Sequence, residues 1–113
     1  MLLKTSEKVH VIERRLFQED VRRHFIGEVI ECSEFAVRIK GFTWVFDLTR
    51  GFQKRPDPRE RIFFLGDRLT LNVLPQTADL NAVTYESNPE KGSLLVTDKK
   101  TFSLEISEFS TFR

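Results

Sequence analysis

Cysteine and histidine are scarce in this chain of 113 residues, which contains one cysteine and two histidines. The lone Cys32 cannot form an internal disulfide, whereas small secreted domains usually carry several bridged cysteines, so we expect a reducing, cytoplasmic environment. The histidines and Cys32 do not follow a Cys-x-x-Cys or His-x-x-x-His spacing. We therefore expect no metal site.

Long apolar runs and an excess of charge are also absent. No segment approaches the roughly 20 consecutive apolar residues of a membrane span, and Leu2 and Leu3 are too few for the apolar part of a signal peptide. Lys and Arg number 18 against 17 Asp and Glu, which gives a net charge of +1. This balance lacks the strongly basic signature of many nucleic-acid-binding proteins. We expect no membrane partner and do not favour nucleic acid.

The chain lacks the common motifs of catalysis as well. It contains no Gly-x-Ser-x-Gly nucleophile elbow, no phosphate-binding loop and no Gly-x-Gly-x-x-Gly dinucleotide fingerprint. The sequence therefore predicts a protein that is not an enzyme and that has no catalytic residue and no cofactor.

What the chain does contain is aromatic and β-branched residues that alternate with polar ones. Eleven Phe and a hydrophobic content of 40% supply enough apolar surface for one core. The alternation predicts strands at residues 9–17, 23–32, 35–47, 61–65, 68–74, 80–87, 94–97 and 101–106. We expect one all-β domain over residues 1–113. It would be a small antiparallel meander barrel or strongly curled sheet of about eight short strands, with a two-sheet β-sandwich as the alternative.

Turn-forming residues separate several of these strands. Gly66-Asp67 predicts a type II′ hairpin, because a leading glycine suits the first central position of that turn. Pro56 and Pro58 cannot donate to a strand ladder, so we expect residues 48–60 to form a long surface loop.

The alternation changes phase at Gly41, and this change marks the first candidate site. Apolar residues before it occupy odd positions (Phe35, Val37, Ile39), and aromatic residues after it occupy even ones (Phe42, Trp44, Phe46). A β-bulge at Gly41 would bring both sets into the core, which is a common role of an isolated strand glycine. A regular strand would instead place the aromatic row on one face with Arg38 and Lys40. Such a face could stack nucleic-acid bases or bind another protein.

A second candidate site is the basic loop that follows, which contains Lys54, Arg55, Arg59 and Arg61. Its guanidinium groups could hold a phosphate or carboxylate. The candidate binding residues are therefore Arg38, Lys40, Phe42, Trp44, Phe46, Lys54, Arg55, Arg59 and Arg61.

These features predict a non-catalytic binding module that uses an aromatic face or a sheet edge for protein partners or self-association. Phe109 and Phe112, three residues apart near the end of the chain, would suit a last helical turn packed on the domain or on a partner. One alternative is binding of single-stranded nucleic acid or another polyanion through Arg38, Lys40, Trp44 and the basic loop. The other is an interior cavity that carries a small apolar ligand, because a barrel of about eight strands can hold one.

Overall fold

The computed structural model describes residues 2–17, 19–88 and 93–106, and every element in them is a strand. The strands are β1 (Lys8–Glu13), β2 (Arg23–Cys32), β3 (Ala36–Asp47), β4 (Gly51–Lys54), β5 (Arg59–Phe64), β6 (Leu69–Leu74), β7 (Thr84–Asn88), β8 (Ser93–Thr97) and β9 (Ser103–Glu105). This confirms the all-β prediction. Within the described ranges there is no helix long and apolar enough to cross a membrane. The predicted turn formed by Phe109 and Phe112 lies outside the described residues.

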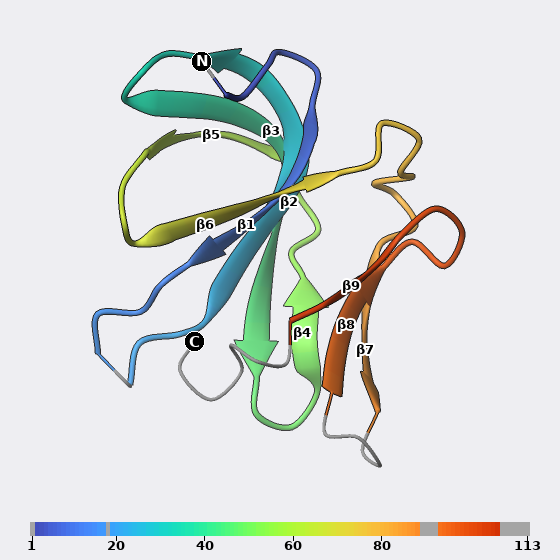
Figure 1. The fold of residues 1–113 in the computed structure, drawn as a ribbon. Helices are drawn as coiled ribbons and strands as arrows, with labels where there is room; N and C mark the ends of the chain where they lie inside the picture. Colours follow the sequence, from blue (N-terminus) through green and yellow to red (C-terminus); the bar gives the residue numbers. More distant parts are fainter. Residues whose placement is uncertain (1, 18, 89–92, 107–113) are drawn as a thin grey trace. The chain divides into compact units, whose positions relative to one another are not determined.

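The chain divides into two compact units, Met1–Leu74 and Pro75–Arg113, and each contains its own antiparallel sheet. In the first unit the strands are ordered β4-β3-β2-β1-β6, and β5 pairs with β3 (Figure 1). The second unit is a meander, β7-β8-β9. No closed barrel is found in the described part of the chain, because β5 and β6 do not pair with each other. The single domain remains a prediction.

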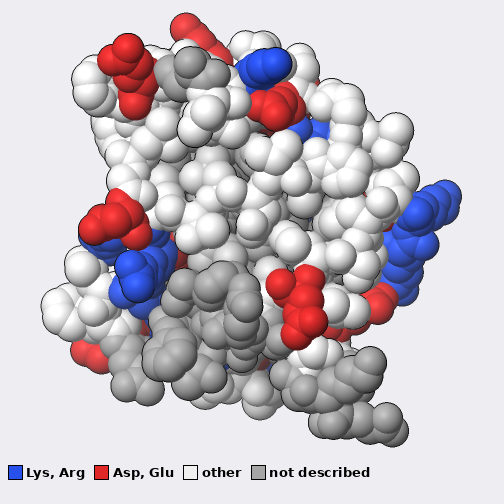
Figure 2. Space-filling model, in the orientation of Figure 1, with Lys and Arg blue, Asp and Glu red and all other residues white. Residues whose placement is uncertain are grey.

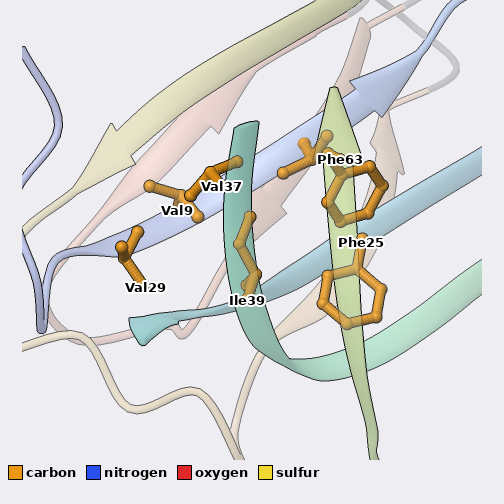
Figure 3. Packing of buried hydrophobic residues seen from close by; sticks show 7 residues of the cluster. Val9, Phe25, Val29, Val37, Ile39 and Phe63 are labelled. Atoms are coloured by element: carbon orange, nitrogen blue, oxygen red, sulfur yellow. The ribbon is translucent and has the colours of Figure 1, made fainter. Parts of the chain in front are cut away.

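The core of the first unit forms on the concave side of its curled sheet. Its buried side chains come from four strands and point toward one another (Figure 3): Val9, Val11, Phe25, Val29, Val37, Ile39 and Phe63. These residues alternate along each strand, as the sequence pattern requires. Because β1 and β5 contribute to one cluster without being neighbours in the sheet, the sheet must curl to bring them together.

Gly41 allows this curl, but not through a bulge. The pairing of β2 with β3 runs without interruption through Gly27 and Gly41, which lie opposite each other, and the register shift falls between Val29 and Glu31. The predicted bulge at Gly41 is therefore wrong. A Cβ atom on Gly41 would lie 2.0 Å from the carbonyl oxygen of Ile26, so only glycine permits the close approach of the two backbones.

The predicted loop over residues 48–60 contains a strand that the sequence pattern did not reveal. Strand β4 pairs with the end of β3, and Asp47 lies opposite Gly51. The Asp47 carboxylate accepts hydrogen bonds from the backbone N–H and the hydroxyl of Thr49, and it forms an ion pair with Arg50. Gly51 adopts a positive φ of 79°. An Asp-capped turn that ends at a left-handed glycine closes a hairpin with a three-residue loop.

The predicted hairpin at Gly66-Asp67 is also wrong. The flanking strands exist, but β5 pairs with β3 and β6 pairs with β1. Gly66 lacks the positive φ that a type II′ turn requires. The segment is a corner instead, in which Leu69 donates a backbone hydrogen bond to Gly66. Beyond this corner no strand of the described residues pairs with the second edge of β5.

Asp98 organises the turn between β8 and β9 in the second unit. Its buried carboxylate accepts hydrogen bonds from the backbone N–H groups of Asp79, Lys100, Thr101 and Phe102 and from the Thr101 hydroxyl. Burial alone would raise the pKa of Asp98, but these donors together hold it well below its usual range.

Candidate functional site

The aromatic row of β3 lies on one face together with Arg38 and Lys40, as expected for a regular strand, but it is not an open platform. Trp44 is only 7% exposed. The Lys54 ammonium lies 3.9 Å from the centre of the Phe42 ring, and the Arg22 guanidinium lies 4.2 Å from that of Phe46. The covered rings offer little surface on which bases could stack.

The predicted cations are partly occupied by contacts within the chain. Arg38 lies 4.0 Å from the Glu31 carboxylate and 3.9 Å from that of Glu60. In Figure 2 the described Lys and Arg residues form small groups separated by uncharged and acidic surface. The described Lys and Arg residues therefore do not form one continuous basic patch on the face shown.

Two histidines that belong to none of the predicted sites meet on the face of the sheet opposite Val9, Val11 and Phe25. His10 and His24 are both buried, and their Nε2 and Nδ1 atoms lie 3.0 Å apart. The Asn72 amide nitrogen lies 3.2 Å from Nδ1 of His10. Because an amide NH₂ group only donates, His10 Nδ1 accepts and its Nε2–H donates to His24. Burial lowers the pKa of His10 to about 4, so this ring is neutral at pH 7.

The hydrogen bonds of β5 define an open strand edge. Leu65, just after β5, donates its backbone N–H to the carbonyl of Phe35 at 2.7 Å. In an antiparallel pair alternate residues face the same neighbour, so Arg61 and Phe63 also direct their backbone groups toward β3. Ile62 and Phe64 must then direct their N–H and C=O groups to the opposite edge. Among residues 2–17, 19–88 and 93–106, β3 is the one strand that pairs with β5.

The side chains beside this edge are apolar and exposed. Ile62 is 53% exposed and Phe64 is 78% exposed, on the face opposite the buried Phe63. Folded proteins usually protect such an edge with charge, proline or a covering element. The first half of β5 carries that protection in Arg59 and Glu60, but the half from Ile62 to Phe64 does not.

A cleft of about 820 Å³ lies beside the unprotected half of β5. Its lining comes from the end of β1 and the loop after it, the first residue of β2, β5, and the corner that leads into β6. Leu16 and Val21, both exposed, line it together with Ile62 and Phe64. The lining also includes Arg61, whose guanidinium pairs with Glu13 at 3.4 Å. That ion pair is half-buried.

No protein-family model matches the sequence, and neither curated proteins nor solved structures match it significantly.

The other outer strands of the described part expose less apolar surface. Strand β6 has one large exposed apolar side chain, Val73, and β9 has the sequence Ser-Leu-Glu, with only its outer two residues exposed. No group of three His, Cys, Asp or Glu side chains in the described residues is arranged to hold a metal ion. Among the described residues, the unprotected half of β5 is therefore the best candidate for a binding site.

Proposed function

We propose that this protein is a non-catalytic interaction module that binds an extended polypeptide segment by strand addition along β5. The observation that carries the proposal is that, among the described strands, β3 alone pairs with β5, and Ile62 and Phe64 are exposed beside its other edge. In strand addition, backbone hydrogen bonds supply affinity, and contacts to alternate side chains supply specificity. The adjacent cleft, with Leu16 and Val21, provides apolar surface for those side chains.

Binding of a defined peptide tests this proposal. The probe is a capped heptapeptide of alternating Val and Thr, and the control is the same peptide methylated at the backbone nitrogens that would face β5. We expect the unmethylated peptide to shift the backbone amide signals of Ile62 and Phe64 in NMR spectra. The methylated peptide should not bind, because it cannot donate hydrogen bonds to the edge. Equal binding by both peptides, or shifts confined to other strands, would contradict strand addition at β5.

A pair of variants at one position separates the edge from the side chain. Ile62→Pro removes an N–H that faces away from β3, so the fold should tolerate it. Leaving the partner carbonyl unsatisfied costs about 1–3 kcal/mol, so affinity for the peptide should fall about fivefold or more. Ile62→Thr shortens the apolar side chain but keeps the N–H, and it should bind more tightly than Ile62→Pro.

The two alternative functions have less support. The burial of Trp44 leaves the polyanion proposal without its stacking residue, although Lys40, Arg55 and Arg59 are exposed cations. The proposal of an interior apolar ligand must account for the buried side chains that point toward one another in this core (Figure 3).

A further inference from the structure

We propose that the segment added to β5 is the β5 strand of a second copy of this chain, paired antiparallel about a two-fold axis at Phe63. This inference rests on the proposed strand addition and names its partner. Closed two-fold symmetry is the commonest arrangement of soluble homo-oligomers, and it requires a surface that is complementary to itself. The sequence of β5 and the corner after it meets that requirement in one register.

The backbone groups fit this register. A two-fold axis at Phe63 places Ile62 opposite Phe64 of the second copy, and Phe64 opposite its Ile62. Both residues direct N–H and C=O groups to the free edge, so each of these pairs exchanges two hydrogen bonds. The sheets of the two copies then form one continuous sheet across the axis.

The side chains favour this register over those centred on Ile62 or Arg61. It pairs the exposed Ile62 with the exposed Phe64, and apolar cross-strand pairs stabilise sheets. An axis at Ile62 would set the Glu60 carboxylate opposite the Phe64 ring. An axis at Arg61 would set two Arg61 residues opposite each other and would pair Phe64 with Pro58, which has no N–H.

Charge complementarity supports the same register at both ends of the paired segment. With the axis at Phe63, Arg59 of one copy and Asp67 in the corner of the other lie at the same end of the paired segment, and symmetry repeats this arrangement at the other end. Both residues are exposed, and neither forms an ion pair within the described part of the chain. The paired strands thus have an apolar centre and opposite charges at each end, as in interfaces that use charge to fix register.

Sedimentation equilibrium from about 1 μM to about 1 mM tests self-association, because a short edge contact gives a small and weak interface. We expect the apparent mass to rise from one chain toward two. Phe64→Lys should remain at the mass of one chain, whereas Leu48→Lys, a matched change at a residue 92% exposed in the β3–β4 turn, should still dimerise. A wild-type chain that stays monomeric, or a Phe64→Lys variant that still dimerises, overturns the inference. If the monomer still binds the Val-Thr peptide, strand addition at β5 survives without the homodimer.

Disulfide trapping tests the register in a Cys32→Ser background. Residues of a hydrogen-bonded antiparallel pair have Cα atoms about 5.5 Å apart, a separation that a disulfide can bridge. Chains with Ile62→Cys mixed with chains with Phe64→Cys should form a cross-linked heterodimer on mild oxidation. Cross-linking of Ile62→Cys chains to themselves in preference to the mixed pair places the axis at Ile62 and overturns the register.

Discussion

Gly27 and Gly41 lie opposite each other on β2 and β3, so close that a Cβ atom on either would collide with the other strand. At Gly27 that atom would lie 2.3 Å from the carbonyl oxygen of Lys40. The contact is made by backbone atoms, which cannot move aside as a flexible side chain could. The two strands cross the bend of the sheet at this point, and β3 passes from its pairing with β5 to its pairing with β4 just beyond it.

The first prediction follows from that contact. Gly41→Ala should lower the free energy of unfolding by at least about 2 kcal/mol, because the backbones must separate to admit the methyl group. Gly66→Ala is the matched control, since a Cβ atom there has no neighbour within 4 Å, and its effect should stay within about 1 kcal/mol. Urea denaturation measures both. Equal stabilities for the two variants would show that the strands are not in tight contact.

The second prediction concerns His10 and acid. Burial lowers its folded-state pKa from 6.5 to about 4, so the unfolded chain binds a proton more readily than the folded one. Stability that is fully present above pH 6.5 should therefore be lost as the pH falls toward about 4, by about 3 kcal/mol from this group. An NMR titration of the imidazole signals measures the pKa directly. A value near 6.5 for His10 in the folded protein would contradict the buried, neutral ring.

The third prediction concerns Asp98 in the second unit. Asp98→Ala removes the acceptor shared by several backbone donors, so the amides of Lys100 and Thr101 should lose protection from hydrogen exchange. Asp57→Ala, at an exposed loop position, is the control and should leave them unchanged. Persistent protection in Asp98→Ala would mean that the turn does not depend on this carboxylate.

The fourth prediction uses Trp44 as a probe, because it is the only tryptophan in the chain. Its burial predicts blue-shifted emission that acrylamide quenches poorly, and single-stranded oligonucleotide at low salt should leave that emission unchanged. Red-shifted emission that oligonucleotide suppresses would support the polyanion alternative.

The sequence predicted most strands because alternation is a local property of residues that bury one face of a sheet. Strand β4 was missed because its four residues are too few to show alternation, although Asp47 and Gly51 marked the hairpin that contains it. The partners of β5 could not be predicted from the corner at Gly66, since the choice between a hairpin and two separate pairings depends on contacts with β3 and β1, which are distant in sequence.

The same limit applies to the sites. The regular course of β3 was one of two outcomes that the phase change at Gly41 allowed, but its aromatic row is covered by Arg22 and Lys54, which a strand pattern alone does not reveal. His10 and His24 share a face only because of the register between β1 and β2. The open edge of β5 depends on which other strands pair with it. The sequence of β5 alone does not determine that pairing.

Backbone hydrogen exchange along β5, measured across protein concentrations, is the most direct test of strand addition at this edge. We expect slow exchange at Arg61 and Phe63 at every concentration, since the backbone N–H groups of both face β3. We expect fast exchange at Ile62 and Phe64 in dilute protein, and protection of these two amides when a second strand is bound. If Ile62 and Phe64 are as protected as Arg61 and Phe63 even in the most dilute protein, the edge of β5 is already paired within the chain and the proposed function is wrong.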